Sequence, residues 1–596
     1  MDGPTATHSI PHLGRQATDR GLRRRWRCRG REPQSTSGNL LDAVLASRGL
    51  TNPGDVERFC NPSLSSLHDP SLIPDLDRAA ARILDAAKAR EPIVIYGDYD
   101  VDGTTGSAIL VRMLALLEPE AQVSTYIPHR IHEGYGLHTE AIERLAADGV
   151  RVVISVDCGI TAVAPALTAR DAGLDLIITD HHNPPAELSE LPDAYAVVHP
   201  RRPDSQYPFG GLCGAGAAYK LAWRLATLHA GSDRVPPASR ELLLELLGLA
   251  ALGTVADVVP LIEENRAIVH AGLRRLKFSP FPGVRALVEA SGLAGEAIAA
   301  EDVGFKLGPR LNAAGRMGHA REALELLISE DTARSRELAT LLTRQNDERR
   351  ALEQRLTADA LELAEKSGMT GPDCRAVVLS APGWHTGVLG IVCSRLVDRL
   401  SRPVLLMSQD GDLCAGSGRS IEGFNLHRAL ESCTDHLDGF GGHDMAAGLR
   451  VHTDRFEAFR EAFIATANEL IRAEDLVRPL DYDCATSLAS LTARAVEETS
   501  RLAPHGAGNP AVRVRLDGLT LDDSPKSFGK HGDHAGLYVR DASGGRPVRL
   551  VGWGWAKDTR HLRRGDPLDA IVEPRLNIWN GQRRIEPNLL DLRLHR

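Results

Sequence analysis

The sequence predicts a multidomain α/β protein, in which a parallel-sheet domain and a smaller α/β domain are joined by a long helix and followed by a C-terminal β-barrel. Short β-branched segments alternate with helical segments between residues 93 and 198, which is typical of a parallel sheet. Residues 331–366 are rich in charge and contain no Gly or Pro, so they predict a long connecting helix. Residues 471–596 hold short strands, many turn residues and no long helical pattern, as in a small barrel.

The elements follow one another in a regular order. Residues 40–88 have a helical pattern, and residues 213–330 are mostly helical. The strands predicted for the first sheet are 93–96, 122–127, 151–156, 175–179 and 194–198, and the helices predicted between them are 104–117, 139–147 and 162–172. Residues 376–379 and 404–407 predict strands of the second α/β unit. We therefore expect domains at 36–330, 369–470 and 471–596, with residues 331–368 as the connecting helix.

Length and composition favour a globular protein of the cytoplasm. A chain of 596 residues suits about three to five domains. The richest apolar stretch, Leu242–Leu252, contains Glu245 and is too short to span a membrane. The first 30 residues contain no apolar signal segment. The nine cysteines form no C-x-x-C pair, which argues against a disulfide framework or structural zinc and favours a reducing compartment.

Charge leaves the choice of partner open. The net charge of −9 does not exclude nucleic acid, because binding depends on local basic surface. Residues 1–35 are rich in arginine, with eight between Arg15 and Arg31 against the single acid Asp19. We expect a disordered tail here, or an upstream start that precedes a domain beginning at about Trp26. The alternative is a basic arm that helps to hold a polyanion.

Acidic and histidine side chains follow the predicted strands of the first domain. Asp98, Asp100 and Asp102 follow the first strand, Asp157 follows the third, and Asp180-His181-His182 follow the fourth. The carboxyl ends of parallel strands form the edge where ligands bind. A single Asp in such a place is usually a turn residue or a helix cap, but five carboxylates gathered there would repel one another unless cations were bound. Asp257, which follows an apolar helix, is a further candidate.

These residue types point to a particular metal chemistry. Carboxylate oxygens with one or two imidazoles favour Mg²⁺ or Mn²⁺. So many carboxylates exceed the needs of one ion, and two ions about 3.5–4 Å apart that share a carboxylate suit in-line displacement at phosphorus. The sequence therefore predicts hydrolysis of a phosphoester.

Several motifs carry a family resemblance. The first domain contains GDYDVDG at 97–103, SVDCG at 155–159, DHH at 180–182, VADVVP at 255–260 and GPRLNAAGRMG at 308–318. Further along are GWHTGVLGIV at 383–392, GSGRS at 416–420, GGHDMAAG at 441–448 and LAPHGAGNP at 502–510. From residue 38 to 596 the chain resembles the DHH phosphoesterase superfamily and, within it, the RecJ-type exonucleases of bacteria. The resemblance implies a DHH catalytic domain, a DHHA1 domain and an OB-fold barrel.

The resemblance also implies roles for individual residues. It implies two Mn²⁺ or Mg²⁺ ions, with Asp157 as their bridge and Asp180 orienting the imidazoles. The implied metal ligands are Asp98, Asp100, Asp102, Asp157, His181 and Asp257, and the implied catalytic residues are Asp98, Asp100, Asp157 and His182. Asp98 is either a ligand or a nearby base, and His182 is expected to face the scissile phosphate.

A second set of residues is expected to bind the substrate. By resemblance, Arg130, Ser417 and Arg419 hold a 5′-phosphate, which a guanidinium takes in bidentate fashion. Arg316 is expected to contact the DNA backbone. His443 lies in a Gly-rich turn that we expect at a helix N-terminus, where backbone N–H groups bind phosphate. The loop at His385 either lines the same cleft or is a simple turn, and Arg310 is expected to be structural.

Aromatic residues of the barrel have two possible roles. Trp553, Trp555, Trp579 and Tyr538 either stack on unpaired bases or fill the barrel core. Residues 526–534, with the sequence KSFGKHGDH, are more polar than the resemblance suggests.

The resemblance implies a single-strand-specific 5′→3′ DNA exonuclease that releases 5′-mononucleotides in recombination and repair. We expect a monomer, and the resemblance implies a RecQ-like helicase and a single-strand binding protein as partners. The first alternative is a DHH phosphodiesterase for short oligonucleotides or cyclic dinucleotides, although such relatives lack the connector and the barrel. The second is a binding scaffold, although scaffold relatives lose the metal ligands that this sequence retains.

Overall fold

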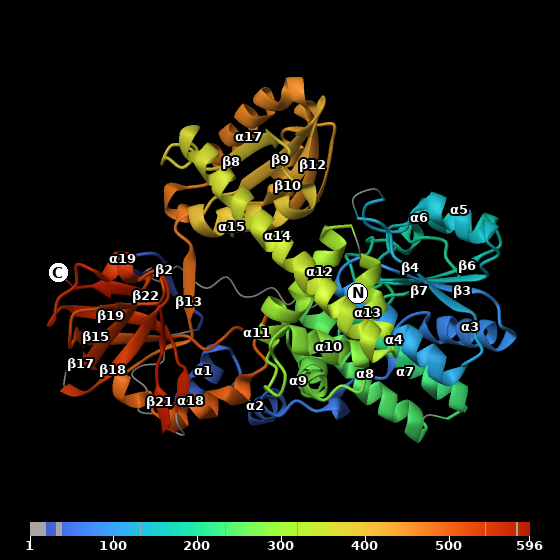
Figure 1. Ribbon diagram of the computed structural model, residues 1–596, viewed down its shortest axis with the longest axis horizontal. Coiled ribbons are helices and arrows are strands. Elements are labelled where there is room, and N and C mark those ends of the chain that lie inside the picture. The colour runs from blue at the N-terminus through green and yellow to red at the C-terminus, as the bar shows by residue number, and fades with distance from the viewer. Residues whose placement is uncertain are drawn as a thin grey trace, which may run out of the picture. The chain divides into compact units, whose positions relative to one another are not determined.

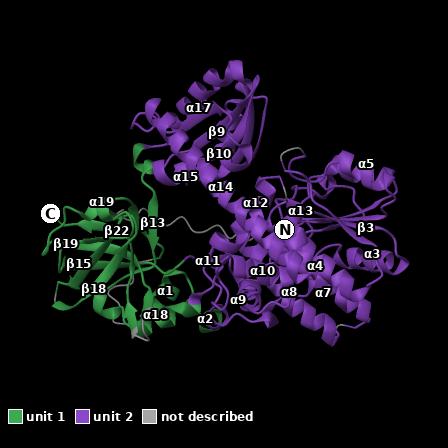
Figure 2. Cartoon of the chain, viewed as in Figure 1, with its two compact units in different colours: residues 1–56, 473–501, 511–596 green, residues 57–472, 502–510 purple. Residues whose placement is uncertain are grey.

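The chain forms two compact units in the computed structural model (Figure 2). The structure describes residues 19–30, 39–130, 133–232, 234–318, 320–542, 544–579 and 582–595. One unit comprises residues 57–472 and 502–510, and the other comprises residues 1–56, 473–501 and 511–596. The unit of residues 57–472 and 502–510 holds both α/β sheets with the helices that cover and connect them, and the other unit holds the barrel.

A five-stranded parallel sheet forms the centre of the first α/β region, as the alternation of strands and helices predicts (Figure 1). Its strand order is β4-β3-β5-β6-β7, and every neighbouring pair is parallel. The strands are β3 (Ile93–Gly97), β4 (Val123–Tyr126), β5 (Val152–Val156), β6 (Asp175–Thr179) and β7 (Ala196–Val198). The predicted ranges differ from these by at most two residues at either end. Strands β3 and β5 are buried throughout, because helices cover both faces.

Alternate residues of these strands enter two different cores. Ile95 and Ile154 pack into the core shared with α4 (Val101–Leu117), α7 (Gly214–Ala230) and α8 (Pro237–Ala256). Val94 and Val153 pack on the opposite face, with α5 (Thr139–Ala147) and α6 (Val163–Asp171). The period of two along each strand therefore fixes which helices cover which face.

Further helices extend this unit. They are α3 (Leu76–Ala89), α9 (Glu263–Lys277), α10 (Pro282–Ala290), α11 (Ala300–Asp302), α12 (Gly308–Arg316), α13 (Ala320–Ile328) and α14 (Thr332–Lys366). Helix α14 has 35 residues and begins after Asp331, whose side chain accepts a hydrogen bond from Ala333 N at 2.7 Å. It is the connecting helix that the run of charged residues predicts. Within the described residues, every helix is too short or too polar to span a lipid bilayer.

The second α/β region contains a five-stranded mixed sheet of order β11-β12-β10-β9-β8. Its elements are β8 (Val377–Pro382), α15 (Thr386–Leu400), β9 (Val404–Asp410), β10 (Leu413–Arg419), α16 (Leu426–Glu431), β11 (Gly439–His443), β12 (Ala446–His452) and α17 (Phe456–Leu470). The expectation that GGHDMAAG opens a helix is wrong, since this segment is the hairpin of β11 and β12. Ala447, Leu449 and Val451 are buried and their neighbours Gly448 and Arg450 are exposed, which is the alternation of a strand.

The other unit contains the predicted barrel. Its seven-stranded sheet runs β14-β15-β19-β22-β18-β17-β16, and an additional pairing of β15 with β17 closes it. The strands are β14 (Cys484–Thr486), β15 (Val514–Leu521), β16 (Lys526–Phe528), β17 (His534–Asp541), β18 (Gly544–Gly552), β19 (Pro567–Glu573) and β22 (Asn588–Leu594). The remaining elements are α1 (Leu40–Ser47), α2 (Pro53–Cys60), which crosses the boundary between the units, α18 (Ala493–Thr499), α19 (Ala556–Thr559), β20 (Leu576–Trp579) and β21 (Gln582–Ile585).

The N-terminal basic segment is partly ordered. Residues 19–20 form β1 and residues 25–28 form β2, which pairs in parallel with β13 (Pro479–Tyr482). Trp26 is almost fully buried, and its Nε1 donates to Asp591 Oδ2 at 2.8 Å. The expectation of a disordered tail is therefore wrong for residues 19–30, because one large apolar side chain among the arginines fixes the segment. The rest of the segment lies outside the described residues.

Replacing Trp26 by Ala should destabilise the barrel unit by about 3–5 kcal/mol, because it empties a large core position and removes a donor from Asp591. Differential scanning calorimetry of the full chain measures the loss. Leu22→Ala is the control: this side chain is exposed, so its removal should change stability by no more than about 0.5 kcal/mol. Equal effects of the two substitutions would contradict the role of Trp26.

Candidate metal centre

The segment after β3 supplies three aspartates in a strand-to-helix turn. Asp98 is buried, and its backbone N–H donates to Val156 O of β5 at 3.1 Å. Asp100 caps α4, accepting from Asp102 N at 2.8 Å and from Gly103 N at 3.2 Å. A Cβ built on Gly103 would lie 2.6 Å from the backbone of Asp98, so only glycine permits this tight turn. The motif thus places one carboxylate at the strand end, one at the cap and one in the first helical turn.

Asp102 and Asp157 are held against the start of α7. Asp102 accepts from Gly214 N at 2.5 Å and from Ala215 N at 2.8 Å, so it satisfies free N–H groups of that helix. Asp157 has a left-handed backbone, with φ of 66°. A Cβ on Gly214 would lie 2.6 Å from Asp157 Cβ, and one on Gly253 would lie 2.5 Å from Asp102 Oδ1. Two helical glycines that the motif search missed therefore make room for these carboxylates.

Asp180 orients the histidines that follow it. Its Oδ1 lies 2.8 Å from His182 Nδ1 and accepts from His181 N at 2.7 Å, while its Oδ2 accepts from Ile160 N at 2.9 Å. Burial alone would raise the pKa of the Asp180 carboxyl. The hydrogen bonds that it accepts and the charge of His182 outweigh burial and lower this pKa to about 2. Burial likewise opposes protonation of His182, yet Asp180 raises the pKa of that imidazole to about 9.

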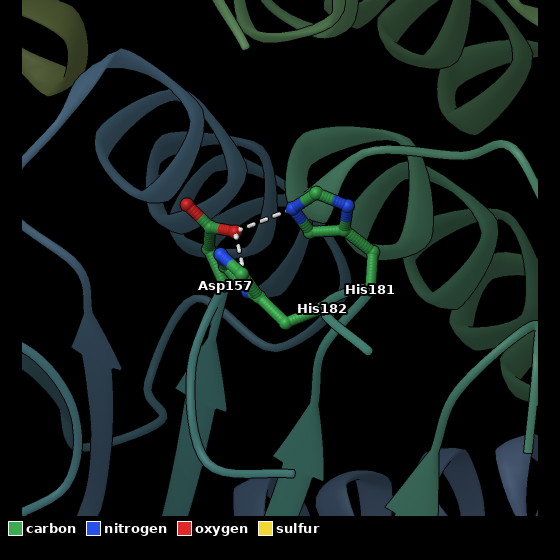
Figure 3. Close-up of side chains that lie close together, drawn as sticks. All are labelled: Asp157, His181 and His182. Carbon is green, nitrogen blue, oxygen red and sulfur yellow. Dashed lines mark ion pairs between the residues drawn. The ribbon is translucent and has the colours of Figure 1, made fainter. Parts of the chain in front are cut away.

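The separate strand ends bring their side chains to one place. His181 Nε2 lies 3.1 Å from Asp157 Oδ1, 3.5 Å from Asp257 Oδ2 and 3.7 Å from Asp102 Oδ2. His182 Nδ1 lies 3.9 Å from Asp157 Oδ1, so both imidazoles approach the same carboxylate oxygen (Figure 3). Three overlapping groups of potential ligands result, each with its atoms within 4.8 Å: Asp98, Asp100 and Asp157; Asp157, His181 and His182; Asp102, His181 and Asp257. Asp157 and His181 each belong to two groups.

The electrostatics of this cluster fit bound cations. Asp98 Oδ1, Asp157 Oδ1 and His181 Nε2 are buried, and within the described part of the chain none has a hydrogen-bond partner of good geometry. Burial and the neighbouring carboxylates raise the pKa values of Asp98 and Asp157, and they raise that of Asp257 to about 8. Such buried, repelling carboxylates with unused oxygen atoms match the preference of Mg²⁺ and Mn²⁺ for oxygen with some imidazole.

Residues outside the predicted set complete the surroundings. The Tyr135 hydroxyl donates to Asp157 O at 3.1 Å, and the same hydroxyl oxygen lies 3.0 Å from His182 Nδ1. His199 lies 2.7 Å by its Nε2 from His182 O, and Arg201 donates to His181 O at 2.6 Å. His199 could have been found by the same pattern that identified the aspartates, because it directly follows strand β7 at the same edge of the sheet.

The predicted phosphate-binding arginines lie near one another. Arg130 packs over the Tyr99 ring at 4.6 Å, and Arg316 Nη1 donates to Gly387 O at 3.2 Å. Burial and the charges of Arg130, Arg349 and Arg419 lower the pKa of Arg316 to about 10. A Cβ on Gly390 would lie 2.9 Å from Arg419 Nη2. A cluster of cations therefore forms where α12, α14, α15 and β10 meet.

The other predicted residues have different surroundings. Ser417 is on β10, two residues before Arg419, and its carbonyl accepts from Cys393 Sγ at 3.1 Å. His443 ends β11, and within the described residues we find no contact between it and the arginines. Arg310 donates to the carbonyls of Lys306 and Ala290, which are bonds that stabilise the helix packing. His385 precedes α15 as its N-cap residue.

A parallel sheet whose carboxyl edge gathers aspartates and paired histidines defines a class, the DHH phosphoesterases. The family models agree: the DHH family N-terminal domain matches residues 92–254, the DHHA1 domain matches 374–469, and the RecJ OB domain matches 482–591.

Two curated relatives narrow the class. The single-stranded-DNA-specific exonuclease RecJ of Bacillus subtilis is 37% identical over 91% of this chain, which spans 66% of that relative's length. RecJ of Escherichia coli is 34% identical over 91% of this chain and 96% of its own length. RecJ of Thermus thermophilus, solved with Mn²⁺, superposes with a TM-score of 0.77 at 32% identity, covering 93% of this chain and 76% of that chain. The chain belongs to the RecJ family.

Replacing Asp157 by Asn should stabilise the protein in EDTA by about 1 °C in unfolding midpoint, the shift expected for about 1 kcal/mol in a compact unit as large as the one that holds Asp157. Burial and the neighbouring acids raise the pKa of Asp157 in the folded state above its value in the unfolded chain. The folded wild type therefore loses stability as pH rises between these two values, and the variant does not.

Thermal unfolding in EDTA at pH 6 and pH 9 tests this, with the larger gain expected at pH 9. Mn²⁺ should stabilise the wild type and have a much smaller effect on the variant. The exposed Asp171→Asn serves as the control. A midpoint of the Asp157 variant below the wild type at both pH values would contradict the repulsion argument.

Proposed function

We propose that this chain is a metal-dependent exonuclease specific for single-stranded DNA, which degrades a strand from its 5′ end and releases 5′-mononucleotides. The observation that carries the proposal is the convergence of seven acidic and imidazole side chains at one sheet edge, in a chain of the RecJ family. Curated relatives that cover most of this chain are named single-stranded-DNA-specific exonucleases, which supports the same substrate here.

The ligand groups around Asp157 suit two divalent cations. Asp98, Asp100 and Asp157 would hold one, while Asp102, Asp257 and His181 would hold the other, with Asp157 near both. Such a pair of Mn²⁺ or Mg²⁺ ions supplies an activated water and neutralises charge at phosphorus.

The chain's own side chains provide orientation. Asp180 fixes the His182 ring, whose side chain is 43% exposed and so remains accessible from outside the cluster. His182 is then suited to donate a hydrogen bond to a non-bridging phosphate oxygen. Arg130, Ser417 and Arg419 hold the terminal 5′-phosphate, and Arg316 contacts the following backbone. A grip on the 5′ terminus sets the polarity, because only a bond next to that terminus then reaches the metal centre.

The barrel contributes a site for unpaired bases. Trp553 is 57% exposed, and its ring packs edge-on against His534 at 4.8 Å and Phe528 at 5.5 Å. Asn588 accepts from Trp553 Nε1 at 3.2 Å, which holds the indole in place. By contrast, Trp555 is 2% exposed and belongs to the core. Tyr538 is half-buried, and the side chain of Trp579 lies outside the described residues. We therefore assign base stacking to Trp553.

Cellular roles follow from the substrate. An exonuclease confined to single strands needs DNA that has been unwound, so we include recombination and repair in the cytoplasm as its setting. A RecQ-like helicase and a single-strand binding protein are the proposed partners of a monomeric enzyme. A phosphodiesterase of short oligonucleotides or cyclic dinucleotides is the alternative that the first experiment below separates.

Digestion of single strands labelled at either end tests the function. With Mn²⁺, 5′-labelled DNA should release labelled mononucleotide at once, whereas 3′-labelled DNA should shorten gradually. Asp157→Ala should lose hydrolysis and keep DNA affinity, because it removes a shared metal ligand and no predicted DNA contact; Asp171→Ala should behave as wild type. Mononucleotide release first from the 3′ end, or activity on dinucleotides alone, would refute the proposal.

Trp553→Ala should weaken binding of single-stranded DNA by about 1–3 kcal/mol, the value of one stacked base. Fluorescence anisotropy with the Asp157→Asn background in EDTA measures binding without cleavage. Trp553→Phe keeps an aromatic face and should lose much less. Unchanged affinity of the Ala variant would remove Trp553 from the binding site.

A further inference from the structure

A buried polar stripe runs along the middle of the connecting helix α14. Gln345, Asn346, Arg349 and Glu353 are all buried, although such residues are usually exposed. Their spacing places them on one face of the helix, and α14 packs against α12 and α15. A helix that served only as a spacer would expose these side chains, so the stripe needs a specific explanation.

Glu353 joins two helices through both of its oxygens. Its Oε2 accepts from Arg349 Nη1 of the same helix at 2.8 Å, and its Oε1 accepts from Arg395 Nε of α15 at 2.8 Å. Arg349 Nη2 also donates to Asn346 Oδ1 at 3.1 Å. The glutamate is only 7% exposed. If either arginine were lost, the buried negative charge of Glu353 would no longer be fully compensated. The two ion pairs therefore fix α15 against α14.

The first turns of α15 carry the proposed phosphate site. Arg316, from α12, donates to Gly387 O, and a Cβ on Gly387 would lie 2.5 Å from Arg316 O. One turn later, Gly390 leaves room for the guanidinium of Arg419 from β10. The position of α15 therefore sets the separation between Arg316 and Arg419, which come from different parts of the fold.

These guanidinium groups also repel one another. In addition to burial, the pKa of Arg316 is lowered by the positive charges of Arg130, Arg349 and Arg419, and the charge of Arg130 also lowers the pKa of Arg419. Without a fixed framework the cations would move apart before an anion arrived. Glu353 supplies part of that framework, because it neutralises Arg349 and holds α15 through Arg395.

We propose that Glu353 is a positioning residue for the terminal-phosphate site, acting through Arg395 and Arg349 to fix the spacing of Arg316 and Arg419. This inference rests on the proposed function, because it takes the terminal 5′-phosphate as the ligand of Arg419 and the backbone that follows it as the ligand of Arg316. Loss of the Glu353 bridge lets α15 shift, so a phosphate monoester gains less from the site, while the metal centre keeps its geometry. The loss is thus much larger for substrates that carry a 5′-phosphate.

Kinetics on two matched single strands test the proposal, one ending in a 5′-phosphate and the other in a 5′-hydroxyl. For Glu353→Gln and Arg395→Met, KM for the phosphorylated strand should rise about tenfold, equivalent to about 1.4 kcal/mol. The kcat for that strand should stay within about twofold of wild type, and KM for the hydroxyl strand, which lacks the ligand of Arg419, should rise by less than about twofold. Glu362→Gln breaks an exposed pair with Lys366 on the same helix and should change nothing.

Binding provides a readout independent of cleavage. In the Asp157→Asn background in EDTA, Arg395→Met should remove the preference for the phosphorylated strand. Arg395 is 60% exposed, so its variant remains informative if Glu353→Gln fails to fold. Equal rises in KM for both strands, a fall in kcat alone, or a retained preference in Arg395→Met would overturn the role of Glu353. A wild type with no preference for the phosphorylated strand would instead refute the phosphate site of the proposed function.

Discussion

Mutual repulsion among buried carboxylates is the constraint on which the catalytic half of this protein depends. Parallel strands all deliver their carboxyl ends to one edge, so Asp98, Asp157 and Asp180 meet there by topology alone. The acids are stabilised differently: Asp180 by His182 and Asp102 by the first N–H groups of α7, whereas Asp157 Oδ1 accepts no hydrogen bond within the described residues. A divalent cation would balance the charge that the protein leaves uncompensated at Asp157.

A second cluster of the same unit has the opposite charge, because it gathers arginines that repel one another. There, Arg316 of α12 and Arg419 of β10 approach the first two turns of α15, and the buried Glu353 of α14 pairs with Arg349 and Arg395. A phosphodiester substrate brings negative charge toward these cations, whereas cations are required at the aspartates. Under the proposed function, the arginine cluster holds the strand and the aspartate cluster cleaves it, and both clusters belong to one compact unit.

Much of this arrangement could be predicted from the sequence, since strand periodicity and the acids after each strand are local signals. The five strands of the first sheet and α14 lie within two residues of their predicted ranges. Other features depend on tertiary contacts that no local pattern encodes. Gly214 and Gly253 look like ordinary helical glycines until a Cβ is placed on them. The glycine-rich segment at 441–448 resembled a helix start, but β11 and β12 pair with each other as a hairpin, and β12 also pairs with β10.

The burial of Trp26 against Asp591 has a consequence for the order in which the protein is assembled during translation. These partners are 565 residues apart, and β2 pairs with β13, which is also synthesised much later. Residues 19–28 leave the ribosome early, but their own contacts cannot form until β13 and Asp591 have been made. The parallel-sheet unit has its strands close together in sequence and is free to fold in the meantime. The barrel unit is thus the last to be completed, although it contains some of the earliest residues made.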